Sequence, residues 1–251
     1  MIYTKQTTKA LRFAYDAHHG QMDKSGAPYI NHPLHVAESM TNEAETIAAL
    51  LHDVVEDTPF TCEDLLNEGF DPAAVEAVRL LTKSDDVSYD DYICAIRENP
   101  IARRVKIEDL QHNMDLSRLG MTEETMSDAV RIRREKYAHS LAYLLPEIVI
   151  RHAAMDDLDA VTAVEAECFP SAEAASRESF ADRLAHFPEC FWLLFEDGKL
   201  ISFVNGMISD DPTLHDEMYH DASMHNPSGA WQMIFGVNTI PSRRKNGHTR
   251  H

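Results

Sequence analysis

The sequence predicts a multi-domain protein in which an all-α helical bundle is followed by an incomplete α/β domain. Up to Pro146, capping residues and prolines punctuate helical patterns, with no convincing strand between them. After Pro146, short runs of β-branched and aromatic residues alternate with helical segments. A chain of 251 residues is long enough for two cores. We therefore expect domains over residues 1–146 and 147–251.

In the first domain, local signals mark where each helix begins or ends. Thr61 with Asp64 forms a capping box, Asp71-Pro72 and Asn99-Pro100 pair a capping residue with proline at the first helical position, and Gly69 ends a helix. Helices are expected over about 7–19, from His32-Pro33, over 42–59, 61–69, 71–82, from Ser88, from Asn99-Pro100, and over 127–145.

In the second domain, we expect a strand at 147–151, helices at 156–168 and 176–186, and three further strands. Two of these, 191–195 and 199–204, flank the two-residue turn Asp197-Gly198 as a hairpin. The fourth is expected at 231–239.

Four ionisable side chains are concentrated in the apolar stretch Ala49–Asp57. His52 and Asp53 are adjacent, and Glu56 and Asp57 follow each of them by four residues. On one continuous α-helix all four would project from a single flank. Burying so much charge is costly unless it is paired or bound to a cation, which favours a metal site.

Two other segments supply candidate ligands. His32 precedes Pro33, and Asp109 lies four residues before Asn113 on an expected helix. Together, His32, His52, Asp53 and Asp109 make a set of two imidazoles and two carboxylates. Mixed nitrogen and oxygen donors suit Mn²⁺, Fe²⁺ or Zn²⁺ better than Mg²⁺ or Ca²⁺. His35 is an alternative to His32, and His112 is interpreted as a structural neighbour of Asp109.

The order His…His-Asp…Asp resembles the HD superfamily of metal-dependent phosphohydrolases. Over roughly residues 5–145, three motifs are similar to the hydrolase domain of the RelA/SpoT family, which removes the 3′-pyrophosphate from (p)ppGpp: G-Q-x-x-K-S-G-x-P-Y-x-x-H-P, L-L-H-D-V-V-E-D-T and V-K-x-x-D-x-x-H-N-M. The resemblance implies a nucleotide (pyro)phosphohydrolase with Mn²⁺ as the expected ion and a phosphorylated nucleotide as the substrate.

This resemblance also implies roles for particular residues. Glu56 and Asp57 would position the attacking water or take its proton. The substrate would be bound by Lys24, Ser25, Lys106 and Asn113, although Asn113 could instead serve helix packing. Lys83 is interpreted as a cation at a helix end that could alternatively touch phosphate.

The chain departs from the family pattern near the expected nucleotide pocket. Asp23 stands where the family usually carries a basic residue thought to face the guanine, and the segment after Asp109 lacks two arginines and a threonine. We therefore expect weaker use of (p)ppGpp than is typical of the family, and a gain from Asp23→Arg.

The second half resembles the GNAT superfamily of N-acetyltransferases. Arg244–Thr249 aligns with its R/Q-x-x-G-x-G/A loop, in which Arg244 and Gly247 would contact the pyrophosphate of acetyl-CoA. Because the sequence ends two residues after Thr249, we interpret the domain as truncated, with 231–239 as an exposed edge strand. Binding of acetyl-CoA is accordingly not expected.

The composition of the chain argues against several classes of function and location. A formal net charge of −19 argues against a nucleic-acid surface, and no apolar run is long enough to suggest a membrane span. The polar N-terminus lacks a signal-peptide pattern, and the four cysteines are widely spaced, so a cytoplasmic protein with reduced thiols is expected. Two alternatives to the hydrolase remain: an acetyltransferase with an accessory HD domain, and a metal-containing regulatory module without turnover.

Overall fold

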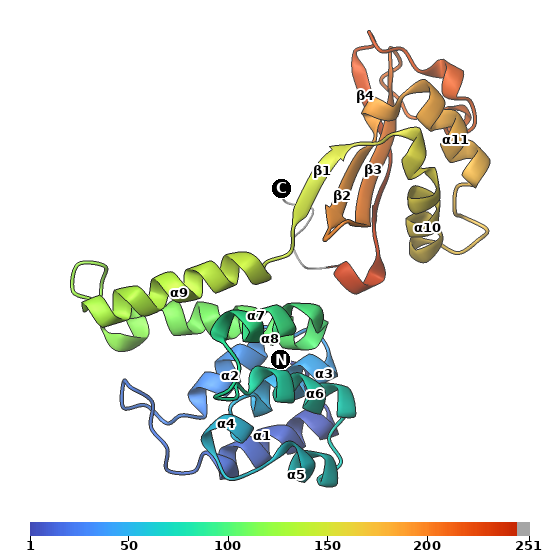
Figure 1. The fold of residues 1–251 in the computed structure, drawn as a ribbon. Coiled ribbons are helices and arrows are strands. Elements are labelled where there is room, and N and C mark those ends of the chain that lie inside the picture. Colours follow the sequence, from blue (N-terminus) through green and yellow to red (C-terminus); the bar gives the residue numbers. More distant parts are fainter. Residues whose placement is uncertain (245–251) are drawn as a thin grey trace. The chain divides into compact units, whose positions relative to one another are not determined.

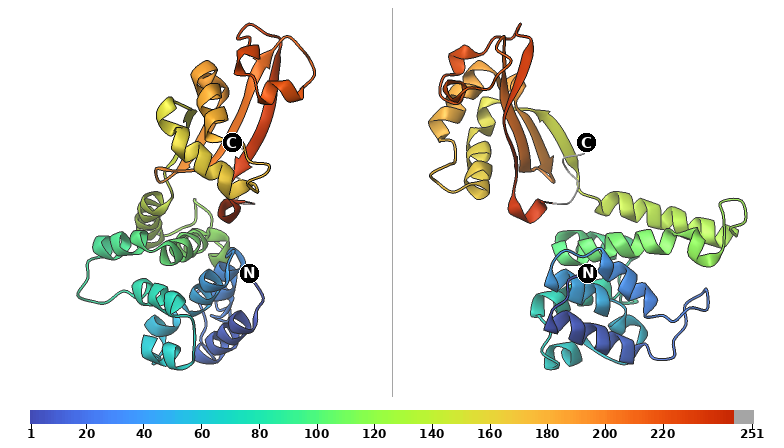
Figure 2. Two further views of the ribbon diagram at one scale, coloured as in Figure 1. Left: turned by 90° about the vertical axis from the view of Figure 1, so that its right-hand side faces the viewer. Right: turned by 180° about the vertical axis from the view of Figure 1, so that it is seen from behind.

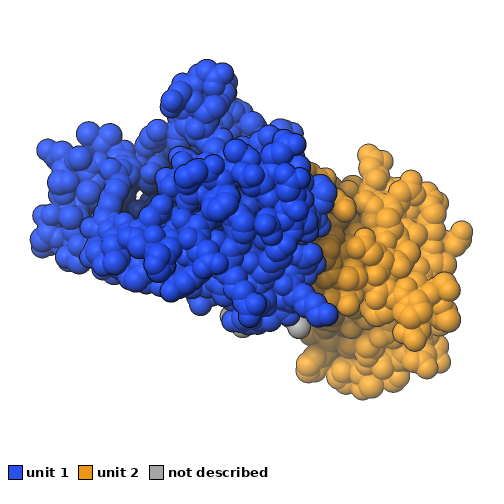
Figure 3. All heavy atoms as spheres, turned by 90° about the horizontal axis from the view of Figure 1, so that it is seen from below, with its two compact units in different colours: residues 1–145 blue, residues 146–251 orange. Residues whose placement is uncertain are grey.

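The chain divides into two compact units, Met1–Leu145 and Pro146–His251, in a computed structural model that describes residues 1–244. The two units are coloured separately in Figure 3. The first is all-α, and the second is built on a four-stranded antiparallel sheet. The fold class expected from the sequence is confirmed.

Unit 1 is a bundle of short helices connected by capped turns (Figure 1). Its α-helices are α1 Lys5–Ala17, α2 Asn31–Glu38, α3 Glu43–Leu51, α4 Val54–Asp57, α5 Cys62–Asn67, α6 Pro72–Leu81, α7 Tyr89–Glu98, α8 Pro100–Met114 and α9 Asp128–Leu144, with a 3₁₀ turn η1 at Leu116–Leu119.

The core of unit 1 surrounds α3. This helix is buried from Thr46 to Leu51, and it packs against α1, α2, α6 and α8. Because its last five residues, Ile47 to Leu51, are all apolar, this end of α3 packs in the centre of the bundle. Its C-terminal end therefore delivers His52 into the interior, where the side chain is 3 % exposed.

The expectation of one continuous helix over 42–59 is wrong. The α-helix stops at Leu51, His52 and Asp53 form a turn, and the four-residue helix α4 follows. At the break, Nδ1 of His52 donates a hydrogen bond to the carbonyl oxygen of Ala49 (2.7 Å). Local side-chain bonding of this kind competes with helical hydrogen bonding. His52 and Asp53 nevertheless keep backbone angles in the right-handed helical region (φ −59°, ψ −35° and φ −95°, ψ −7°).

Unit 2 pairs its sheet with two helices on one face (Figure 2). The order along the sheet is β1 Ile148–His152, β2 Trp192–Glu196, β3 Lys199–Ser209 and β4 Trp231–Thr239, and the helices are α10 Leu158–Cys168 and α11 Arg177–His186. The predicted turn joins β2 to β3, with Asp197 and Gly198 both at positive φ (47° and 78°). Four fully buried phenylalanines lie in the core: Phe180, Phe187, Phe191 and Phe203.

Strand β3 runs five residues beyond the predicted end at Val204. The register of β3 on β4 shifts between Asn205 and Gly206. A Cβ on Gly206 would lie 1.8 Å from the carbonyl oxygen of Met233, so the close approach of the two strands requires glycine there. The pair Asn-Gly looks like the end of a strand in sequence, but here it marks a bulge within one.

Strand β4 has one neighbour, β3, among the described residues, as expected of an edge. Beyond it, Arg244 donates from Nε to the carbonyl oxygen of Thr239 (2.9 Å). Gly247 and Thr249 of the GNAT-like motif lie outside the described residues. Within residues 1–244, no helix is both long and apolar enough to cross a membrane.

Candidate metal centre

The four predicted ligands converge in the interior of unit 1, although they come from three separate segments. His32 lies in α2, His52 and Asp53 in the turn after α3, and Asp109 in α8. Nε2 of His32 is 3.1 Å from Oδ1 of Asp109 and 3.3 Å from Nε2 of His52. Oδ2 of Asp53 is 3.5 Å from Nε2 of His32 and 3.2 Å from Nε2 of His52.

These spacings match those of ligands around one small cation. Zinc-like ions hold nitrogen and oxygen ligands at about 2.0–2.2 Å, so neighbouring donors in a tetrahedral site lie roughly 3.3–3.6 Å apart. His32, His52 and Asp109 are all buried and present donor atoms within 4.8 Å of one another. Asp53, on the more open side, reaches both imidazoles with its Oδ2. The donor set fits a divalent metal ion.

Both imidazoles turn Nε2 toward the other proposed ligands. Nδ1 of His52 donates to the carbonyl oxygen of Ala49. Burial lowers the pKa of His52, but the charge of Asp53 outweighs it and raises this pKa to about 9, so a metal ion would take the place of the Nε2 proton. Nδ1 of His32 lies 2.6 Å from Nδ1 of His112. Burial, and then the charge of Arg118, lower the pKa of His112 to about 3, so this ring is neutral and can accept the proton of His32.

Electrostatics keep both carboxylates ionised. Burial alone would raise the pKa of Asp53, but the adjacent His52 outweighs it and lowers the pKa to about 2. For Asp109, burial is again opposed, chiefly by Lys106, and the pKa falls well below its usual range. Charged carboxylates are the form that binds a metal.

Sequence reasoning missed Tyr29. Its hydroxyl donates to Oδ2 of Asp53 (2.7 Å) and so fixes the orientation of that carboxylate. Tyr29 belongs to the motif Pro28-Tyr29-Ile-Asn-His32, which was interpreted only through its histidine. The available signal was its position three residues before a proposed ligand, in the turn that leads into α2.

Two predicted substrate-binding residues, Lys106 and Asn113, contact the proposed ligand Asp109. Nζ of Lys106 is 2.8 Å from Oδ2 of Asp109, and Nδ2 of Asn113 donates to Oδ1 of the same residue (2.5 Å). Asp109 is therefore held from both oxygens by its own helix, at i−3 and i+4. Through these contacts, Lys106 and Asn113 orient the carboxylate of Asp109.

Glu56 and Asp57 lie on α4, exposed beside the cluster. Burial, and then the negative charge of Asp53, raise the pKa of Glu56, while the nearby Lys106 counteracts this. The carboxylate of Asp57 is close enough to Tyr29 to contribute to the raised pKa of that phenol, after burial and Asp53. Both acids thus lie near the ligands without being among them.

Lys24 and Ser25 lie on an exposed loop closed by the bridge Met22–Pro28. Asp23 organises this loop, because its Oδ1 accepts from N–H and Oγ of Ser25 and from N–H of Ala27. Nη2 of Arg118 is 3.3 Å from Oδ2 of Asp23, and Nη1 donates to the carbonyl oxygen of His112 (3.0 Å). These bonds, that of Ser25 first, lower the pKa of Asp23 to about 2.

The remaining candidates lie outside the ligand set. His35 stacks on His112 at 3.9 Å between ring centroids, and His112 stacks in turn on His32. Lys83 donates to the carbonyl oxygen of Ser84 (2.9 Å), as an ordinary cation near a helix end can. From the sequence, His112 was expected to be a structural neighbour of Asp109. In the structure its ring contacts His32.

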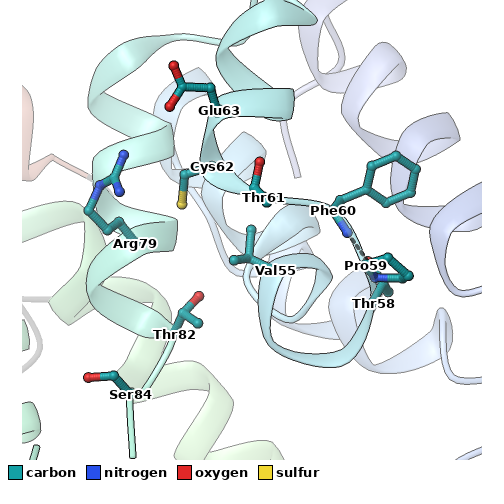
Figure 4. Close-up of a pocket in the computed structure, with 10 residues that line it drawn as sticks. All are labelled: Val55, Thr58, Pro59, Phe60, Thr61, Cys62, Glu63, Arg79, Thr82 and Ser84. Atoms are coloured by element: carbon teal, nitrogen blue, oxygen red, sulfur yellow. Dashed lines mark hydrogen bonds between the residues drawn. The ribbon is translucent and has the colours of Figure 1, made fainter. Parts of the chain in front are cut away.

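A cavity of about 730 Å³ lies beside α4 but is separate from the metal centre. Figure 4 shows Phe60 at one end of its lining and Arg79 and Glu63 at the other. It is lined by Val55, by residues 58–63, and by Arg79, Thr82 and Ser84, and it shares no residue with the predicted site.

Comparisons with known proteins find similar sequences for most of unit 1. Residues 10–129 match the HD domain family. The bifunctional (p)ppGpp synthase/hydrolase SpoT of Escherichia coli K12 is 37 % identical over 125 residues, covering 44 % of this chain and 18 % of the relative. The guanosine-3′,5′-bis(diphosphate) 3′-pyrophosphohydrolase of Vibrio cholerae is 42 % identical over 104 residues, covering 38 % and 15 %. The chain thus spans less than a fifth of the length of these relatives.

Solved structures give two further likenesses. A metazoan SpoT orthologue that hydrolyses ppGpp covers 75 % of this chain and 97 % of its own, with 23 % identity and a TM-score of 0.43. A GNAT-like decarboxylase, GphF, in complex with isobutyryl-CoA covers 39 % of this chain and 52 % of its own, with 33 % identity and a TM-score of 0.36.

Residues 10–129 are thus similar to the HD domain family, and this segment contains a buried His and Asp cluster suited to a metal. Its curated homologues include (p)ppGpp 3′-pyrophosphohydrolases.

Proposed function

We propose that unit 1 is a metal-dependent phosphohydrolase that removes pyrophosphate from the 3′ position of guanosine 3′,5′-bis(diphosphate), leaving GDP, or GTP from the pentaphosphate. The observation that carries this proposal is the convergence of His32, His52, Asp53 and Asp109, with both Nε2 atoms facing two ionised carboxylates. The names of the homologues supply the substrate. Mn²⁺ is the proposed ion, since mixed imidazole and carboxylate donors suit it.

When bound, a divalent ion would lower the pKa of a water and neutralise charge on the transferred phosphate. The protein's own side chains would transfer the proton, orient the water and bind the substrate phosphates. Glu56, whose pKa is raised by burial and by the charge of Asp53, is proposed to take a proton from the attacking water. Asp57, beside Tyr29, is the second candidate for orienting water. Lys106 and Asn113 orient Asp109 through their hydrogen bonds to its carboxylate. Lys24 and Ser25 are proposed to bind the substrate phosphates from the loop that Asp23 caps.

The test separates metal binding from chemistry. The isosteric variants Glu56→Gln and Asp57→Asn should keep about one equivalent of metal, and at least one should lose turnover by roughly 10²-fold or more. Glu124→Gln, an exposed carboxylate away from the cluster, is the matched control and should keep full activity. Pyrophosphate release from ppGpp in the presence of Mn²⁺ is the assay. Full turnover in both variants would show that the assigned roles are wrong, and no hydrolysis by the wild type would refute the function.

A further inference from the structure

Gln21 belongs to the first motif of the chain, but the mechanism proposed for unit 1 gives it no role. Nε2 of Gln21 donates to the carbonyl oxygen of Asp57 (3.2 Å), and Oε1 lies 2.8 Å from Nδ1 of His18. Asp57 is the last residue of α4, and His18 directly follows the last residue of α1. One amide group therefore connects the end of α1 to the end of the helix that carries both proposed catalytic acids.

The helix α4 has only four residues, so it depends on contacts with the rest of unit 1. The last carbonyl groups of a helix have no partner within the helix. In α4, the hydroxyl of Thr58 donates to the carbonyl oxygen of Val54 (2.6 Å), and Gln21 donates to that of Asp57. Because Gln21 lies 36 residues away along the chain, its bond fixes the end of α4 against the loop that follows α1.

The donors and acceptors of this connection can be arranged in one way only. A carbonyl oxygen can only accept, so Gln21 turns its amide nitrogen to Asp57 and its Oε1 to His18. His18 therefore donates from Nδ1. Gly20, at a φ of 79°, makes the turn between the two side chains, and N–H of Gln21 donates to the carbonyl oxygen of His18 (3.0 Å).

The choice of histidine at position 18 is not explained by packing. The ring is 3 % exposed and lies against the ring of Tyr29, with 4.9 Å between the centroids. Its Nε2 is buried and has no hydrogen-bond partner within residues 1–244. A buried nitrogen without a partner costs stability, and the apolar ring of phenylalanine would avoid that cost. What the imidazole of His18 adds is the bond from Nδ1 to Gln21.

The backbone of Gln21 is also connected to the metal centre. Its carbonyl oxygen accepts from N–H of Tyr29 (3.0 Å), and the hydroxyl of Tyr29 donates to Oδ2 of Asp53 (2.7 Å). N–H of Asp57 donates to the carbonyl oxygen of Asp53 (2.8 Å). Gln21 thus binds the backbones of Tyr29 and Asp57, the two residues that bond to the proposed ligand Asp53, but its own side chain bonds no proposed ligand.

We propose that Gln21 is a positioning residue for Asp57, and that His18 holds the amide of Gln21 in the orientation that this role requires. The inference rests on the function proposed for unit 1, in which Asp57 is a candidate for orienting the attacking water. The bond to the carbonyl oxygen of Asp57 fixes the backbone from which its carboxylate extends. Loss of this bond would displace the carboxylate from the water and slow the chemical step, while the metal ligands stay in place.

Steady-state hydrolysis of ppGpp by the full chain with Mn²⁺ tests this proposal. Gln21→Met, which keeps the length of the side chain but not its amide, should lower kcat roughly tenfold or more, leave KM within about twofold, and keep about one equivalent of metal. Gln21→Glu keeps the acceptor for His18 but loses the donor to Asp57, so it should behave in the same way. Gln6→Met, at an exposed position on α1, is the matched control and should keep full activity.

A double-mutant comparison separates positioning of Asp57 from general damage to the fold. In the Asp57→Asn background, Gln21→Met should lower kcat by less than about twofold, because the group that Gln21 positions has already been replaced. His18→Phe keeps a ring against Tyr29 but removes the donor to Gln21. It should lower kcat in the wild type and have no further effect in Gln21→Met.

The proposal is overturned if folded Gln21→Met and Gln21→Glu keep the kcat of the wild type, if they lose the metal, or if Gln21→Met lowers kcat by the same factor in the Asp57→Asn background. A wild-type kcat in folded His18→Phe would overturn the role of His18. Full turnover of Asp57→Asn would overturn this inference alone, since Glu56 would remain as the catalytic acid. No hydrolysis by the wild type would refute the proposed function itself, and this inference with it.

Discussion

At the metal centre, residues that are not ligands determine how the ligands are oriented. Tyr29 fixes Asp53, Asn113 and Lys106 fix Asp109, and the carbonyl oxygen of Ala49 fixes His52. Outer partners of this kind set the tautomer and direction of each donor before the metal binds. The affinity of the site for metal should therefore depend on these residues as well as on the ligands.

Tyr29→Phe isolates one such partner. The substitution removes a single hydroxyl and leaves Oδ2 of Asp53 free to rotate, so metal affinity should fall by roughly 10- to 100-fold. Competition with a chromophoric chelator measures this change. Tyr15→Phe, at an exposed position on α1, serves as the control. Equal affinity of Tyr29→Phe and the wild type would show that the hydroxyl does not orient the ligand.

The pairing of Asp23 with Arg118 changes the expectation for Asp23→Arg. Asp23 caps its loop through Ser25 and Ala27 and meets the guanidinium of Arg118, so an arginine would remove these bonds and repel Arg118. Charge-assisted hydrogen bonds are worth about 1.5–3 kcal/mol. We now predict a fall in kcat/KM for ppGpp of roughly tenfold or more, with a smaller fall for Asp23→Asn, which keeps the shape of the cap. Steady-state kinetics of the two variants measure this, and a gain for Asp23→Arg would show that residue 23 faces the nucleotide.

The convergence of the four proposed ligands could be predicted from sequence because these residues stand in three motifs that resemble one family. The contacts of Tyr29 and Arg118 could not, because they join residues 24 and 95 positions apart. No local pattern encodes such pairs. The same holds for His112, whose partner His32 is 80 residues away.

Among the secondary-structure elements, α8 contributes most to the centre, because it carries Lys106, Asp109 and Asn113. Asn99 caps its N-terminus, with Oδ1 accepting from N–H of Ile101 (3.0 Å) and Ala102 (2.9 Å), and Pro100 follows at the first helical position. Both features were read from the sequence, because capping is a local property. The break after Leu51 was not, because it depends on how the buried end of α3 meets the cluster.

Asn99→Ala should destabilise unit 1 by about 1 kcal/mol, because two helix N–H groups lose their acceptor. The midpoint of thermal unfolding should fall by about 2–4 °C. Asn99→Asp keeps the acceptor and should stay close to the wild type. Circular dichroism at 222 nm follows the transition, and an unchanged midpoint for Asn99→Ala would mean that the cap contributes nothing to stability.

At the scale of the whole molecule, each unit has its own hydrophobic core. One core draws on residues from Ala10 to Leu144 and the other on residues from Ala153 to Ile240. The four proposed ligands and both proposed catalytic acids belong to unit 1. The chemistry of the metal centre should therefore not require unit 2.

A fragment of residues 1–145 tests this separation. It should fold cooperatively, bind about one equivalent of metal, and hydrolyse ppGpp within about twofold of the full chain. Elemental analysis and the pyrophosphate-release assay provide the two measurements, with Asp109→Ala in the same fragment as the metal-free control. A folded fragment that has lost metal or activity would show that unit 2 contributes to the site.

The central claim, that the buried His and Asp cluster hydrolyses the 3′-diphosphate of ppGpp, is tested most directly by ³¹P NMR of the reaction. With Mn²⁺ and the wild type, the 3′-diphosphate signals should disappear while pyrophosphate and GDP accumulate in equal amounts. Chelation should stop the reaction, and Mn²⁺ should restore it in the wild type but not in Asp109→Ala. Release of inorganic phosphate, cleavage at the 5′ position, or hydrolysis that persists in Asp109→Ala would contradict the account.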